Sequence, residues 1–113
     1  MRSIEKLLKE QGHVWFYVAE RWQQEFYEEL ISLKMRFMSG DNITQESIGV
    51  LMGISKDGTV GYVSHFIWYN SFFSSSSTPA KVDYEKYRCG KEDYLITKPN
   101  ITPVSWNDVE VVE

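Results

Sequence analysis

Apolar positions near the start of the chain follow helical spacing. Ile4, Leu7 and Leu8 share one helical face, because residues three and four apart are neighbours on a helix. Ser3 precedes them and is a residue type that caps helix N-termini, and Gly12 follows them and can close a helix in the left-handed conformation. The pattern predicts a short helix between Ser3 and Gly12.

The next segment, from residue 13 to residue 38, contains neither Gly nor Pro. Its large apolar residues recur at steps of three, four or seven, and they are Trp15, Trp22, Phe26, Leu30, Leu33 and Phe37. This spacing predicts one long helix that ends near Gly40, with Lys34 and Arg36 in its last turn, where cations complement the helix dipole. The run HVWFYVA, residues 13–19, also fits a buried strand that leads into a shorter helix. We favour the continuous helix.

The sequence KDGT, residues 56–59, lies between two apolar runs and predicts a β-hairpin. A two-residue loop at Asp57 and Gly58 pairs Ile54 with Gly61 and continues the ladder to residues 48 and 67. In this register an aromatic residue faces each glycine of the first strand, Tyr62 opposite Gly53 and Phe66 opposite Gly49. The hairpin therefore accounts for both strand glycines.

The stretch TQESIGVLMGIS, residues 44–55, resembles the first helix and turn of the helix-turn-helix in many bacterial transcriptional regulators. The resemblance implies a DNA-binding regulator whose reading unit spans residues 43–69. The segment departs from that pattern, because SKDGTV holds one residue more than the usual step and the recognition helix would contain Gly58 and Gly61. Lys56 is the only Lys or Arg between residues 40 and 79, whereas a DNA reader needs several cations. We favour the hairpin and expect no nucleic-acid partner.

The second half of the chain leaves two interpretations open. The segment SFFSSSSTPA predicts a Ser-rich loop over residues 74–79. The segment TPAKVDYEKYRCG, residues 78–90, fits a helix capped by Thr78, with Pro79 at its first position and Gly90 past its end. It also fits a hairpin that turns at RCGK, residues 88–91. The end of the chain, ITPVSWNDVEVVE, fits an edge strand or a frayed acidic segment.

These patterns predict one α+β domain over residues 1–113. Its helical part is expected over residues 1–40 and a mainly β part over residues 41–113. N-terminal helices, one of them long, are expected to pack on an antiparallel sheet that contains the hairpin at Asp57 and Gly58.

Composition narrows the class of protein. The chain has 113 residues, a net charge of −4, four Trp, seven Tyr and six Phe, and so can build a folded core. No apolar run is long enough to cross a membrane, and the N-terminus carries charges where a signal peptide needs apolar residues. The single cysteine, Cys89, is compatible with a reducing compartment. We expect a cytoplasmic protein with no membrane contact.

No motif in the chain specifies a reaction. His13, His65 and Cys89 are the only soft metal ligands, and none lies at the close spacing of a zinc site. Cys89 lacks the context of a catalytic nucleophile, and His65 would lie on the apolar face of the hairpin. The expectation is a protein that is not an enzyme and holds neither a cofactor nor a metal.

The surplus of aromatic residues suggests a protein-binding role. The long helix would carry a second apolar face formed by Tyr17, Tyr27, Ile31 and Met38. We therefore hypothesise a small non-catalytic module that binds another protein or a second copy of itself. Its size and charge are typical of inhibitor and immunity-type proteins of mobile elements. An alternative is a ligand binder or enzyme with a pocket between long helix and sheet, lined by Trp22, Tyr62 and His65.

Overall fold

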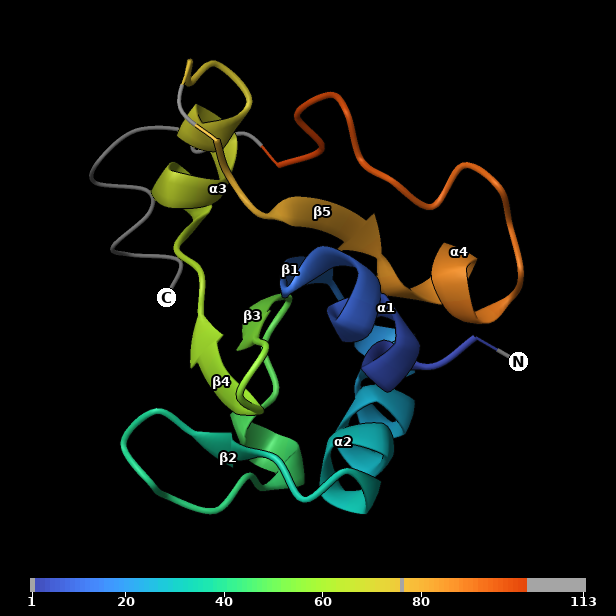
Figure 1. Cartoon of the computed structure of the whole chain (residues 1–113), viewed down its shortest axis with the longest axis vertical. Helices are drawn as coiled ribbons and strands as arrows, with labels where there is room; N and C mark the ends of the chain where they lie inside the picture. The colour runs from blue at the N-terminus through green and yellow to red at the C-terminus, as the bar shows by residue number, and fades with distance from the viewer. Residues whose placement is uncertain (1, 76, 102–113) are drawn as a thin grey trace.

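A computed structural model describes residues 2–75 and 77–101 and shows an α+β arrangement around one sheet (Figure 1). The sheet has five strands in the order β2-β4-β3-β1-β5. The strands are β1 (His13–Tyr17), β2 (Arg36–Phe37), β3 (Leu51–Ser55), β4 (Thr59–Tyr62) and β5 (Ala80–Asp83). The α-helices among the described residues are α1 (Ile4–Gln11), α2 (Gln23–Ser32), α3 (His65–Ser71) and α4 (Tyr84–Arg88). Two 3₁₀ turns, η1 (Glu20–Trp22) and η2 (Gln45–Ser47), complete the set.

The sheet is mixed, which corrects the prediction of an antiparallel sheet. Strand β3 runs antiparallel to both β1 and β4, but β1 pairs with β5, and β2 with β4, in parallel. Each parallel pair is joined by a long crossover, as parallel pairing requires: α2 and α3 are among the elements between β1 and β5, whereas η2 and β3 lie between β2 and β4. Among these strand pairs, only the pair β3–β4 could be recognised from local sequence, because only these two strands follow one another through a tight turn.

The predicted first helix is confirmed. Helix α1 begins after Ser3, whose side chain accepts a hydrogen bond from the backbone N–H of Lys6, and it ends at Gly12 with a φ of +83°. Ile4, Leu7 and Leu8 are buried as their spacing predicted.

The predicted long helix is wrong, and the alternative of a strand followed by a shorter helix is confirmed. Residues 13–17 form β1, which pairs with β3 along one edge and with β5 along the other. Val14 and Phe16 are buried on one face and Trp15 stacks on Trp68 at the other, so apolar side chains occupy both faces and do not alternate with polar ones. The helical spacing belongs to α2, which buries Phe26 and Leu30 and ends at Ser32. Lys34 and Arg36 therefore do not lie in a last helical turn, and Gly40 ends a tight turn after β2 instead of a helix.

The predicted hairpin is confirmed, but its register is shifted by one residue. Its loop has three residues, 56–58, and Ile54 pairs with Val60 instead of Gly61. The side chain of Asp57 accepts hydrogen bonds from the backbone N–H and the hydroxyl of Thr59, and Gly58 adopts a φ of +87°. This geometry fits a three-residue hairpin loop with Gly in the left-handed position.

The ladder also ends earlier than predicted. Ser64 accepts a hydrogen bond from the backbone N–H of Ile67 and so caps α3, which places His65 in a helix instead of opposite Val50 on a strand. Residues 43–69 thus form η2, the hairpin and the start of α3, and they do not form the two helices of a helix-turn-helix.

The two interpretations of residues 78–90 each hold in part. Residues 80–83 form β5, and residues 84–88 form α4, with Asp83 as its N-cap and Gly90 beyond its end at a φ of +77°. Residues 94–96 return along β5 through a bridge between Val82 and Leu95. The described part of the Ser-rich stretch 74–79 is a loop, as predicted. The predicted edge strand or frayed end at residues 102–113 lies outside the described residues.

Helices α1 and α2 cover one face of the sheet, and α3 lies on the other (Figure 1). Adjacent residues of β1 show the two sides, since Phe16 packs edge-on against Phe26 of α2 and Trp15 stacks on Trp68 of α3. Across the residues described, no helix has both the length and the apolar character needed to cross a membrane.

Candidate functional site

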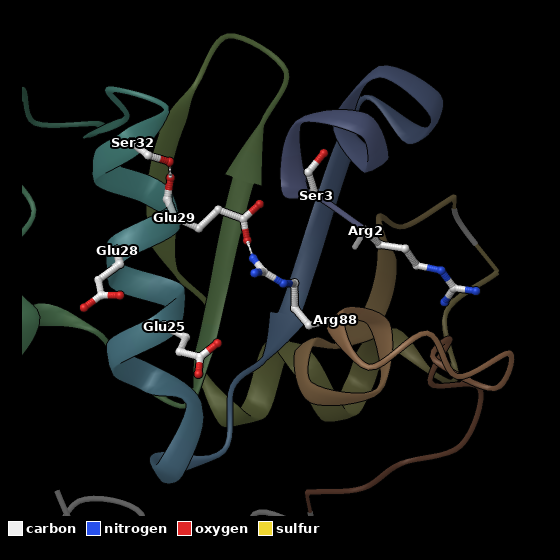
Figure 2. A pocket seen from close by; sticks show the side chains of 7 residues that line it. All are labelled: Arg2, Ser3, Glu25, Glu28, Glu29, Ser32 and Arg88. Carbon is white, nitrogen blue, oxygen red and sulfur yellow. Dashed lines mark hydrogen bonds and ion pairs between the residues drawn. The ribbon is translucent and has the colours of Figure 1, made fainter.

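Two regions of the surface combine a hollow with chemically distinctive side chains. The first lies where α1, α2 and α4 meet, and we call it the polar junction. Its hollow measures about 370 Å³ and is lined by Arg2, Ser3, Glu25, Glu28, Glu29, Ser32 and Arg88 (Figure 2). Arg88 reaches from α4 across to Glu29 on α2.

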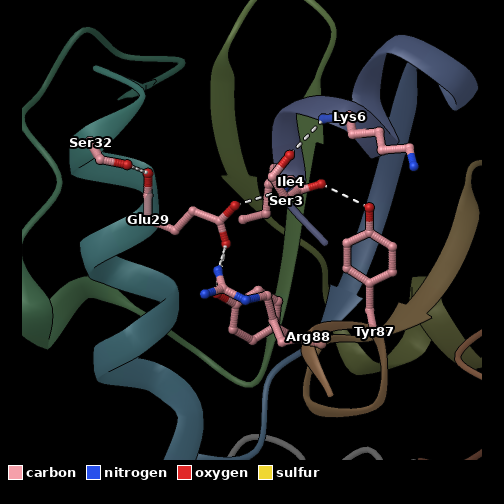
Figure 3. A network of polar contacts seen from close by, with 8 residues as sticks. Ser3, Ile4, Lys6, Glu29, Ser32, Tyr87 and Arg88 are labelled. Carbon is pink, nitrogen blue, oxygen red and sulfur yellow. Dashed lines mark hydrogen bonds and ion pairs between the residues drawn. The ribbon is translucent and has the colours of Figure 1, made fainter. Parts of the chain in front are cut away.

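Glu29 is the centre of the polar junction. One carboxylate oxygen accepts a hydrogen bond from the hydroxyl of Tyr84 at 2.8 Å and forms an ion pair with Arg88. The other oxygen accepts from the backbone N–H of Ile4 at 2.6 Å, so Glu29 supplies an anion to the N-terminus of α1 (Figure 3). Both oxygens are therefore engaged by donors from the chain itself.

Burial accounts for the electrostatics of the junction. It is the main cause that raises the pKa of Tyr84, and the negative charge of Glu29 raises it further, so the hydroxyl stays protonated and donates its hydrogen bond. The side chains of Glu29 and Arg88 are only 10% and 18% exposed, and each charge is compensated by the other. Tyr87 ties α4 to α1 by donating to the carbonyl of Ser3 at 2.8 Å. This arrangement joins three helices and engages both carboxylate oxygens of Glu29 with donors of the chain itself.

The second region lies on the face of the sheet that α3 covers only in part. A groove of about 200 Å³ runs there, and its lining residues are His13, Trp15, Met38, Gly53, Ser55, Thr59, Gly61, Tyr62, Val63 and Ile67. Gly53 and Gly61 are direct partners in the ladder and form its floor. A Cβ atom on Gly53 would approach Trp15 to 3.1 Å, and one on Gly61 would approach the Met38 sulfur to 3.3 Å. The two glycines thus allow these side chains to lie close against the sheet.

Helix α3, which borders the groove, belongs to a stretch that is free of acidic residues, lysine and arginine. Residues 58–80 contain no Asp, Glu, Lys or Arg. Trp68 anchors the helix, since it is fully buried, stacks on Trp15 and donates its indole N–H to the side chain of Asn100 at 2.8 Å. The outer residues of this stretch, Ile67 and Phe73, remain 57% and 65% exposed.

Lys81 of β5 contacts residues of the same region. Its ammonium group lies 5.6 Å from the ring centre of Trp15 and 4.8 Å from that of Phe72, and it donates to the hydroxyl of Thr78 at 3.1 Å. Burial lowers the pKa of Lys81. The lysine therefore fixes the segments on either side of the Ser-rich loop to the sheet.

The residues predicted to bind a protein do not share one face. Tyr17 lies in β1, and Tyr27 and Ile31 lie on α2, where Tyr27 packs against the core and Ile31 is partly exposed. Met38 follows β2 and is 77% exposed beside the groove.

The residues of the predicted pocket are also separated. Trp22 packs edge-on against Tyr84 on the helical side, and His65 begins α3. Tyr62 lies 5.6 Å from Phe37 between ring centres, hydrogen-bonds to the carbonyl of Ser47 and lines the groove. The structure therefore brings together Met38 and Tyr62 from the two predicted sets.

Sequence reasoning missed the groove and its residues Gly53, Gly61 and Ile67 as a site. The uncharged run from residue 58 to residue 80 was a signal that could have identified its border. Within the described ranges, no group of three or more His, Cys, Asp or Glu residues could hold a metal ion. No family model, no curated protein and no solved structure matches this chain.

Proposed function

We propose that this protein is a non-catalytic module that binds another polypeptide through the region around the groove. We call this region the uncharged surface and define it by the exposed side chains of Met38, Tyr62 and Ile67, which line the groove, together with those of Phe66 and Phe73 in and just after α3. The observation that carries the proposal is that three large side chains line a groove and stay more than half exposed, and that α3 beside it belongs to a stretch without Asp, Glu, Lys or Arg.

The exposed apolar area of this surface favours binding to a partner. Exposed apolar surface gains free energy when it is removed from water, and contiguous patches of it mark interaction sites on folded proteins. Met38 and Ile67 both line the groove over its glycine floor, so a partner side chain that enters the groove would contact them. Apolar and aromatic anchors that enter such hollows dominate the binding energy of protein interfaces.

The absence of cations from residues 58–80 also bears on the kind of partner. A nucleic-acid surface needs Lys or Arg to neutralise phosphates, so the proposal is a protein partner. The finer assignment to the inhibitor or immunity-type proteins of mobile elements rests on size, net charge and aromatic content. The cytoplasmic location likewise stays a prediction.

A selection from displayed random peptides tests the proposal. We expect the purified chain to select peptides with apolar or aromatic anchors. Their binding should be lost with Ile67→Glu, which places a charge at the edge of the groove, and retained with the matched variant Ile31→Glu on α2. Peptides that bind both variants equally well would show that the uncharged surface is not a polypeptide site.

A further inference from the structure

We infer that the uncharged surface binds a second copy of this chain, so that the protein forms a two-fold symmetric dimer. This inference rests on the proposed function, because it names the partner of the same surface.

Charge is the first argument for a second copy. Two copies, each with a net charge of −4, repel one another, and α1, α2 and α4 all carry charged residues, whereas α3 contains no Asp, Glu, Lys or Arg. In a two-fold contact the same patch meets itself, so charges near the axis face charges of the same sign. Residues 58–80 contain no Asp, Glu, Lys or Arg and therefore add none of this repulsion. The charged residues that flank Met38 in the sequence, Arg36 and Asp41, have opposite signs.

Area is the second argument. The exposed fractions on the uncharged surface are Met38 77%, Tyr62 64%, Phe66 42%, Ile67 57% and Phe73 65%. At roughly 200 Å² for a fully exposed large side chain, the three that line the groove correspond to about 400 Å², and all five to about 600 Å². A stable interface buries about 800 Å² on each partner, so the groove residues supply about half of that area and Phe66 and Phe73 beside them add to it.

Shape is the third argument. A two-fold interface must be complementary to itself, which requires a projection and a recess on the same surface. Met38 projects beside the groove over Gly53 and Gly61, and both features belong to the uncharged surface. In a dimer, an apolar side chain of each copy can occupy the groove of the other, and the two contacts form together.

Sedimentation equilibrium of the full chain tests the inference. We expect the average mass of the wild-type protein to rise with concentration from 13.3 kDa towards twice that value. Ile67→Glu and Met38→Glu should each weaken the dimer by about tenfold or more, because each places a negative charge in the interface. The matched control Ile31→Glu should dimerise as the wild type does, and thermal melting of the variants at low concentration verifies that each one folds.

Two results would overturn the inference. One is a wild-type chain that remains monomeric at every concentration, and the other is a loss of dimer with Ile31→Glu as large as that with Ile67→Glu. A monomer that still binds displayed peptides in an Ile67-dependent manner would remove the second copy as partner and leave the proposed function standing. A monomer that binds no peptide would remove both.

Discussion

The polar junction involves α1 and α2, which cover one face of the sheet, whereas the uncharged surface lies beside α3 on the other face (Figure 1). The two regions differ in the contacts that their side chains make. At the polar junction, ionisable side chains from α2 and α4 are bound by one another and by the backbone of α1. At the uncharged surface, large apolar side chains surround a groove and remain exposed to water. The polar junction has the ionisable side chains that are usually associated with a functional site, whereas the uncharged surface has the larger exposed apolar area.

This difference shows that titratable residues around a hollow do not by themselves indicate function. A carboxylate whose oxygens already accept three hydrogen bonds contributes to stability, because removing it would leave buried donors unsatisfied. An exposed apolar side chain contributes little to folding, because it stays in contact with water. The free energy of removing it from water can still be gained when a partner binds. The comparison predicts that substitutions at the polar junction affect unfolding, whereas substitutions at the uncharged surface affect association.

The largest effect is expected from Glu29→Ala. This variant removes the carboxylate that pairs with the largely buried Arg88 and the acceptor for the N–H of Ile4, so the free energy of unfolding should fall by about 3 kcal/mol. Urea unfolding followed by circular dichroism measures the change. Glu28→Ala on the exposed side of α2 is the control and should change stability by about 0.5 kcal/mol or less. Equal losses in both variants would contradict a structural role for Glu29.

The two floor glycines of the groove should respond differently to substitution by alanine. Gly53→Ala must displace the edge of Trp15, which stacks on the buried Trp68, together with Val63, and should lower stability by about 2 kcal/mol. Gly61→Ala meets only the sulfur of the exposed Met38, which can move, so its effect should be about 0.5 kcal/mol or less. Thermal unfolding of the two variants in parallel checks this order. A greater loss in Gly61→Ala would show that Met38 is held as firmly as Trp15.

A smaller, pH-dependent effect is expected at the hairpin loop beside the groove. The hydrogen bond from the Thr59 hydroxyl, followed by that from its backbone N–H, lowers the pKa of Asp57. A carboxyl group with a lowered pKa in the folded state stabilises the protein above its unfolded pKa, and this contribution is lost as the pH falls through the folded value. The stability difference between wild type and Asp57→Asn should therefore be constant near neutral pH and shrink below about pH 4. A difference that does not change with pH would contradict this account of the loop.

The smallest effect on stability is expected at the uncharged surface itself. Met38→Ser removes a side chain that is 77% exposed, so the free energy of unfolding should change by about 0.5 kcal/mol or less. The measurement is made at a concentration at which the chain is monomeric, because dimerisation would add to apparent stability. A loss comparable to that of Glu29→Ala would place Met38 in the folding core and erase the contrast between the two regions.

The sequence predicted correctly those elements that are determined by residues close together in the chain. Helix α1 followed from its caps and apolar stripe, and the hairpin followed from its turn residues. The hairpin register was missed by one residue, because the hydrogen bonds of Asp57 to Thr59 favour a three-residue loop over the expected two-residue loop. Strand β1 was missed because residues covered on both faces show no alternation, and the apolar spacing therefore fitted a helix as well.

The candidate site could be predicted only in part, because its two sides come from distant segments. Met38 and Tyr62 were named for different reasons, and the parallel pairing of β2 with β4 places them together. Such pairing depends on tertiary packing and has no local turn that would reveal it. Gly53 was noticed as a glycine that needs an aromatic neighbour, but that neighbour is Trp15 of β1 and not Tyr62 of the hairpin.

The central claim is that the uncharged surface, and not the helical side, is where this protein meets another copy of itself. A dilution series of methyl NMR spectra tests it most directly, because Met38 and Ile67 report on the groove while Ile31 reports on α2. We expect the methyl resonances of Met38 and Ile67 to shift with protein concentration and that of Ile31 to stay fixed. A shift at Ile31 without one at Met38 and Ile67, or spectra that do not change with concentration, would contradict the claim.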